Sequence, residues 1–168
     1  HGVADQLLAV AVEVAEDTGA TVAATVAMAE RAILAIGRQD WREAGVLVEQ
    51  ARLAVTTAHL EDCVTSVLLY AAGARVAIHK GDLGQAEQDL TRARRLRPHL
   101  THALPYYAVQ ARLELIRAYL ALTDVAAARS VLREVDDLLR WRPDLGILPG
   151  QAGQLRSQLD QLHGDVIG

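Results

Sequence analysis

An aspartate recurs at a fixed interval in this 168-residue chain, and an alanine follows each copy four residues later. The pairs begin 42 residues apart and are Asp40/Ala44, Asp82/Ala86 and Asp124/Ala128. An apolar residue stands eight positions after each aspartate and a small or short one eleven positions after it: Val48/Ala51, Leu90/Ala93 and Leu132/Val135. A period of a few tens of residues is typical of stacked helical hairpins, which bury their apolar faces against their neighbours.

The composition agrees with an all-helical chain. Hydrophobic residues make up 51% of it, mostly Ala, Val and Leu with no Phe, which suits helices packed closely through small side chains. We therefore predict an all-α fold, a right-handed superhelical array of antiparallel helix pairs. Helix-breaking glycines and prolines, together with N-cap aspartates, indicate about eight helices. Their expected ranges are 3–18, 20–37, 41–58, 62–80, 83–97, 102–122, 125–141 and 147–163.

The repeats define the expected domain organisation. We predict a single repeat domain over 1–168, cut from a longer chain, with repeats at 20–61, 62–101 and 102–143 and a terminal helix at 147–163. Asp40, Asp82 and Asp124 each stand where an N-cap oxygen would accept from the free amides of the next helix. Loss of one such cap costs about 1 kcal/mol.

The start of the chain is expected to leave an open end. Ala51 lies one period after Ala9, so the first helix is interpreted as the second half of a hairpin whose first half is missing. An open end exposes an apolar face. The rest of a parent protein, a second copy, or crystal neighbours could cover it.

Helical spacing assigns two faces to the first helix of each repeat. The positions 12, 8 and 5 residues before each aspartate share a sector and are predicted to form the seam: Met28/Ala32/Ala35, Tyr70/Ala74/Ala77 and Arg112/Ile116/Tyr119. The opposite sector is expected to line a concave wall, with Arg75 and Arg117 side by side. Two neighbouring guanidinium groups suit a carboxylate or phosphate. The alternative is that Glu114, three residues before Arg117, simply pairs with it.

Further candidates for ligand or partner binding lie near the same wall. His79 and Gln110 belong to the sector of Arg75 and Arg117, and Tyr106 and Tyr107 could stack on a ligand at the start of a long helix. Their alternative role is to cover the junction between two repeats. Trp41 is expected to fill the gap between repeats rather than bind a ligand.

Several classes of function leave no trace in the sequence. It has no phosphate-binding glycine loop, no HExxH and no Gly-x-Ser-x-Gly, so we predict neither an enzyme nor a cofactor. No metal site is expected, because the His99 and His102 pair has no third ligand nearby. The single cysteine, Cys63, favours a reducing, cytoplasmic setting. A net charge of −4 disfavours DNA binding by this chain, and no apolar stretch is long enough to cross a membrane.

The turn and the helix after it resemble the tetratricopeptide repeat. The resemblance rests on residues 81–86, then Leu90, Ala93 and Pro98, with Ala74, Ala77 and, in the next copy, Tyr119 in the first helix. The usual unit has about 34 residues. This one has 42, so its helices are expected to be about two turns longer in total.

A longer run is similar to the helical-repeat region of actinobacterial LuxR-family transcriptional regulators, including the maltose-regulator group. It comprises residues 95–98, 102–115, 131–139 and 142–146, within a resemblance that extends from about 20 to 160. The resemblance implies a regulatory domain placed before a C-terminal helix-turn-helix. Neither a helix-turn-helix nor an NTPase loop is recognisable in these residues, so DNA binding and nucleotide hydrolysis would belong to other parts of a parent protein.

The expected function is therefore a regulatory sensor for transcription. The array would bind a small effector or a protein or peptide partner and pass the signal to a DNA-binding domain outside this chain. The alternative is a free-standing scaffold for protein interactions. A homodimer formed through the open ends or the last helix is a third alternative.

Overall fold

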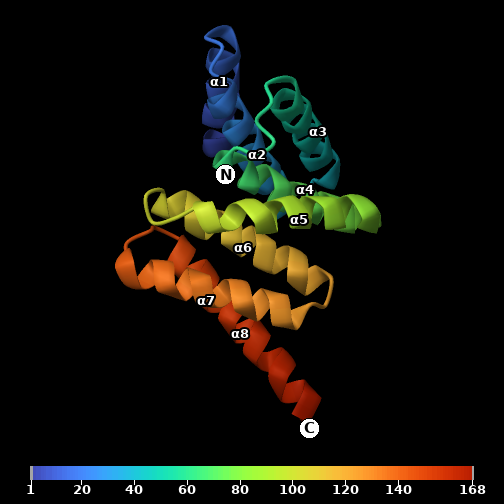
Figure 1. The fold of residues 1–168 in the computed structure, drawn as a ribbon, viewed down its shortest axis with the longest axis vertical. Helices are drawn as coiled ribbons and strands as arrows, with labels where there is room; N and C mark the ends of the chain where they lie inside the picture. Colours follow the sequence, from blue (N-terminus) through green and yellow to red (C-terminus); the bar gives the residue numbers. More distant parts are fainter. Residues whose placement is uncertain (1, 168) are drawn as a thin grey trace. The chain divides into compact units, whose positions relative to one another are not determined.

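The computed structural model describes residues 2–167, with side chains described up to residue 162, and this part of the chain is helical without any strand. Figure 1 shows the order of the helices. They are α1 (Gly2–Asp17), α2 (Thr21–Gly37), α3 (Trp41–Thr57), α4 (Val67–Lys80), α5 (Leu83–Leu96), α6 (Pro105–Ala121), α7 (Val125–Trp141) and α8 (Leu148–Ile167), with short 3₁₀ segments η1 (Val64–Ser66) and η2 (Arg97–His99). The predicted all-α class is confirmed.

The chain divides into two compact units, residues 1–99 and 100–168. In the first unit α2 lies between α1 and α3, and α4 packs on α2, α3 and α5 (Figure 1). In the second unit α6 packs on both α7 and α8, which also contact each other.

The same tight turn joins the helices of each predicted repeat. Its last residue before the aspartate has a positive φ, at Gln39 (62°), Gly81 (77°) and Thr123 (58°). The aspartate amide then donates to the carbonyl five residues back, on Ala35, Ala77 and Tyr119. This pattern closes a helix through a left-handed residue. The 42-residue repeat in the sequence therefore corresponds to a repeat in the structure, because the same turn occurs three times at that interval.

The three aspartates cap the helices that follow, as predicted. Each carboxylate accepts from the backbone amide three residues on, at 3.0 Å from Glu43, 3.0 Å from Gln85 and 2.9 Å from Ala127. These bonds satisfy amides that have no partner within the helix.

We expect Asp82→Ala to lower the free energy of unfolding by about 1 kcal/mol, because the amide of Gln85 loses its acceptor. Urea denaturation would measure the change. A suitable control is Asp137→Ala, which removes an exposed carboxylate that pairs with Arg140 in its own helix. That control should change stability by less than about 0.5 kcal/mol, as surface ion pairs do. Equal losses in the two variants would contradict a capping role.

The seam of each hairpin is buried at the predicted positions. All nine residues at four, eight and eleven positions after the aspartates are buried, and so are all nine seam residues of the preceding helices. One of these is the charged Arg112, whose guanidinium donates to the carbonyls of Leu100 and Ala108. The 42-residue register therefore identifies the buried residues of each hairpin seam.

Two helices begin three or more residues later than predicted. α4 starts at Val67 after the 3₁₀ turn η1, and α6 starts at Pro105 rather than at residue 102. Proline takes the first helical position because it lacks the amide that would have no partner there. At the start of the chain, Ala9 is only partly buried, whereas Ala51 and Ala93 are fully buried. No described helix is long and apolar enough to span a bilayer.

Candidate functional site

A pocket of about 190 Å³ lies between α7 and α8 in the second unit. Arg129, Arg133 and Asp136 are spaced four and three residues apart and so share one face of α7. The apolar face of the same helix, which includes Val131 and Val135, is buried. The full lining comprises Arg129, Leu132, Arg133, Asp136, Arg156, Leu159 and Asp160.

Two contacts hold the polar lining of this pocket in place. Arg129 donates through Nη2 to the backbone carbonyl of Leu159 at 2.8 Å, and Arg156 forms an ion pair with Asp136. Each contact joins α7 to α8, so both helices define the shape of the pocket. Leu159 is buried and supplies an apolar surface beneath the charges.

The charges of the pocket suit one class of small molecule. Arg129 and Arg133, one helical turn apart, offer guanidinium donors to an anionic group. Asp136 and Asp160 offer acceptors on the same lining. A carboxylate or phosphate that also carries a hydroxyl or amino group would match both kinds of side chain. The described lining therefore offers groups that can hold a small anion.

The residues predicted from the sequence fall into both units. Arg75 and His79 belong to α4 in the first unit, whereas Tyr106, Tyr107, Gln110 and Arg117 belong to α6 in the second. A contact between Arg75 and Arg117 would have to bridge the units, and it stays a prediction.

His79 is engaged with the neighbouring helix. Its ring stacks on that of Trp41, with centroids 4.0 Å apart and planes 7° apart. Trp41 is the first residue of α3 and His79 lies in the last turn of α4. The pair thus covers the junction between two predicted repeats, which is the role expected for Trp41.

Arg117 is held by its neighbours in the second unit. It forms an ion pair with the buried Glu114, at 2.5 Å, and donates to the side-chain oxygen of Gln151 in α8 at 3.1 Å. This pairing with Glu114 is the alternative to anion binding that was predicted from the sequence. Arg117 therefore links α6 to α8.

The remaining predicted residues differ in exposure. Tyr106 is exposed in the first turn of α6 and Tyr107 is half-buried beside it. Gln110 is buried, so its side chain faces the packed interior rather than a solvent-filled wall. Their role in binding stays a prediction.

A buried ion pair that sequence reasoning missed lies in the first unit. Arg52 of α3 donates to both carboxylate oxygens of Asp89 in α5, at 2.8 and 3.0 Å, and Gln85 donates to one of them at 3.2 Å. The Asp89 side chain is 0% exposed. Burial alone lowers the pKa of Arg52, but the hydrogen bond and charge of Asp89 outweigh it and raise that pKa above its ordinary value. The sequence does contain a signal for this pair: Asp89 is charged, whereas the equivalent positions of the other two repeats hold the apolar residues Leu47 and Val131.

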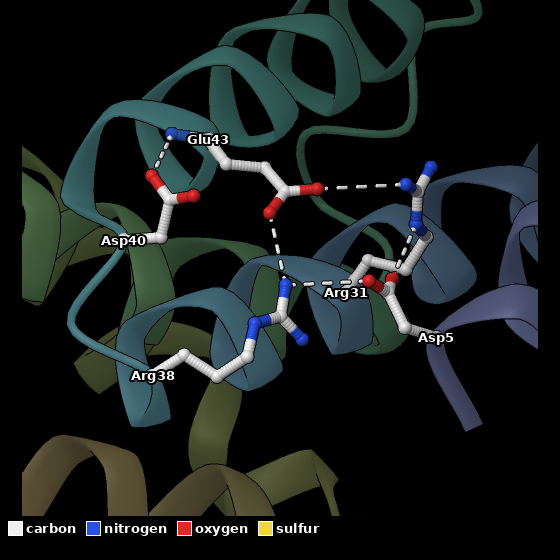
Figure 2. Close-up of polar contacts among 5 residues, drawn as sticks. All are labelled: Asp5, Arg31, Arg38, Asp40 and Glu43. Carbon is white, nitrogen blue, oxygen red and sulfur yellow. Dashed lines mark hydrogen bonds and ion pairs between the residues drawn. The ribbon is translucent and has the colours of Figure 1, made fainter. Parts of the chain in front are cut away.

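A second charged cluster joins three helices of the first unit. Figure 2 shows Arg31 of α2 and Arg38, the residue directly after α2, between Asp5 of α1 and Glu43 of α3. Asp5 accepts from Arg31 at 2.8 Å and from Arg38 at 3.2 Å, and Arg38 also donates to Glu43 at 2.9 Å. The hydrogen bond from Arg31 lowers the pKa of Asp5 more than burial raises it, and both arginine charges add to the lowering. The cluster orients α1 on α2.

The described residues contain no group of three or more His, Cys, Asp or Glu side chains that could hold a metal ion. The ring of His102 stacks on the ring of Trp141, which is exposed, and the two ring centroids are 6.4 Å apart.

Comparisons with known proteins add no family to this description. No protein-family model matches the chain, and neither a curated protein nor a solved structure is significantly similar to it.

Proposed function

We propose that this chain is the regulatory, tetratricopeptide-like sensor domain of a LuxR-type transcriptional regulator. It binds an effector or partner and couples that event to a DNA-binding domain outside the chain. The observation that carries the proposal is the turn repeated at Gln39, Gly81 and Thr123 with the same hydrogen bonds. Helical repeats of this kind provide binding surfaces. The resemblance of the segments 95–98, 102–115, 131–139 and 142–146 to the repeat regions of such regulators supplies the link to transcription.

The pocket between α7 and α8 is the proposed effector site. Its arginines and aspartates suit a small carboxylate or phosphate with hydrogen-bond donors of its own. Because Arg129 and Arg156 each bridge α7 and α8, an anion that competes for these guanidinium groups would change how the two helices are held together. Regulation requires such a difference, since an effector shifts an equilibrium only when it binds the two states unequally.

The effector site is tested by thermal unfolding of the 168-residue chain with small carboxylates and phosphates that carry hydroxyl or amino groups. A compound that binds the folded state raises the melting temperature by mass action. We expect Arg129→Ala/Arg133→Ala to abolish that rise. The control, Arg140→Ala, removes an exposed arginine of the same helix that does not line the pocket and should keep the rise.

Two results would contradict this assignment. A rise that persists unchanged in Arg129→Ala/Arg133→Ala places the effector elsewhere, and its loss in Arg75→Ala/Arg117→Ala alone would favour the wall predicted from the sequence.

The transcriptional role is tested separately, with the parent polypeptide and its operator DNA. The effector should change the DNA affinity of the parent, while the 168-residue chain alone should not bind that DNA. A chain that binds peptides, with no effect on DNA affinity, would instead indicate a scaffold for protein interactions.

A further inference from the structure

α1 exposes a continuous apolar stripe. The stripe consists of Val3 (70% exposed), Leu7 (65%), Val10 (55%) and Val14 (56%). At about 100° per residue, these four side chains occupy a sector of about 60° on one side of the helix. The opposite side, with Leu8, Val12 and Ala15, is partly or fully buried and is the side that packs on α2.

A helix with apolar residues on two opposite sides is expected to be covered on both. Within the described part of the chain, the α2 side of α1 is covered and the stripe is exposed. The stripe has intervals of four, three and four residues, which is the spacing of the core positions in a coiled coil. An exposed apolar surface of this kind marks an interaction site, and the spacing indicates that its partner is another helix.

The spacing also reads the same in both directions. When two copies of α1 lie antiparallel, Val3 of one copy meets Val14 of the other, and Leu7 meets Val10. Every apolar side chain of the stripe then finds an apolar partner, twice over, about a two-fold axis. Such self-complementarity is the property of an isologous interface between identical subunits.

The flanks of the stripe and the charges of α1 favour the same arrangement. Ala4 and Ala11 border one edge and are small enough for the helices to approach closely. α1 has no basic residue, and Glu13, Glu16 and Asp17 gather at its C-terminal end. A parallel pair would bring these carboxylates together. An antiparallel pair places them beside the first turn of the other copy, where the free backbone amides carry positive charge and the carboxylate of Asp5 is already paired with Arg31 and Arg38.

We propose that α1 is the interface through which two copies of this chain pair, with their α1 helices antiparallel and the four stripe residues at the centre. The occupant of the stripe is therefore a second copy of the same chain. This inference is independent of the effector pocket and of any role in transcription.

Sedimentation equilibrium of the 168-residue chain over a range of concentrations tests the pairing. We expect a reversible monomer–dimer equilibrium. Leu7→Lys should raise the dimer dissociation constant by about 100-fold or more, since each dimer loses two buried leucines and each is worth about a factor of ten or more. The control, Leu53→Lys, changes an equally exposed leucine on α3 and should leave the dissociation constant unchanged. Circular dichroism verifies that both variants remain helical.

Disulfide cross-linking tests the orientation in a Cys63→Ser background, which lacks other cysteines. A mixture of Val3→Cys and Val14→Cys chains should form cross-linked heterodimers, whereas Val3→Cys alone should not cross-link to itself. A chain that stays monomeric at every concentration, or a dimer unaffected by Leu7→Lys, would overturn the proposal. Efficient self-cross-linking of Val3→Cys would overturn the antiparallel arrangement.

Discussion

Arg52→Met is expected to lower the free energy of unfolding by about 3 kcal/mol or more, because it leaves the carboxylate of Asp89 buried without its charge partner. Asp89 has no exposed side-chain surface, so water cannot replace the guanidinium unless the packing opens. Gln85 still donates one hydrogen bond to the carboxylate, but an amide does not balance its charge. Urea denaturation of the variant and the unmodified chain would measure the loss.

The double variant Arg52→Met/Asp89→Leu is the matched control. It removes both charges together and places at residue 89 the leucine found at the equivalent repeat position, Leu47. Replacing a whole buried ion pair by apolar residues is often neutral or stabilising. We therefore expect the double variant to recover most of the stability that Arg52→Met loses. If the single and double variants lose the same amount, the cost would come from lost packing around residue 52 and not from the unpaired charge.

The second large effect is expected at Gly73, in the middle of α4. A Cβ atom there would lie 2.6 Å from a carboxylate oxygen of Asp89 and 3.0 Å from Nη2 of Arg52. Both atoms are fixed by their mutual hydrogen bonds, so they cannot move without weakening the buried pair. Overpacking of this kind costs about 1–3 kcal/mol. It outweighs the gain of about 0.5–1 kcal/mol that alanine gives over glycine inside a helix.

Gly73→Ala should therefore lower the melting temperature, and Gly153→Ala serves as its control. Gly153 also lies within a helix, α8, but a Cβ atom there meets nothing within 4 Å, so the same substitution should stabilise the chain. In an Asp89→Ala background the penalty of Gly73→Ala should largely disappear, because the crowding carboxylate is gone. A stabilising Gly73→Ala in the unmodified chain would contradict the close approach.

Much of the local structure could be predicted from the residues. Asp40, Asp82 and Asp124 were predicted as caps because a short acidic side chain before an amphipathic run satisfies free amides, and those contacts depend on only a few neighbouring residues. The buried seam followed from helical periodicity combined with the 42-residue register. The conformation of the turn residues was harder to predict. A positive φ is expected for Gly81 from its residue type, but not for Gln39 and Thr123, which also adopt it.

The polar contacts between helices were not predictable in the same way. The pair of Arg52 and Asp89 joins residues 37 positions apart on different helices, and the pocket joins Arg129 and Arg133 to Arg156 across α7 and α8. Helical spacing shows that Arg129 and Arg133 share a face. It does not show which helix lies against that face, because this depends on how packed helices are oriented.

Residue patterns alone predicted the all-helical class, the caps and the residues of the hairpin seams, because each depends on interactions between residues close together in the chain or one period apart. The packing of the helices decided the contacts between distant residues: Arg117 bonds to Gln151 of α8, Asp89 is buried against Gly73, and the stripe of α1 is left uncovered. The physical reason is that side-chain pairing requires both partners to be placed within a few ångströms. That placement is the result of the packing of all the helices in a unit, and local sequence patterns do not encode it.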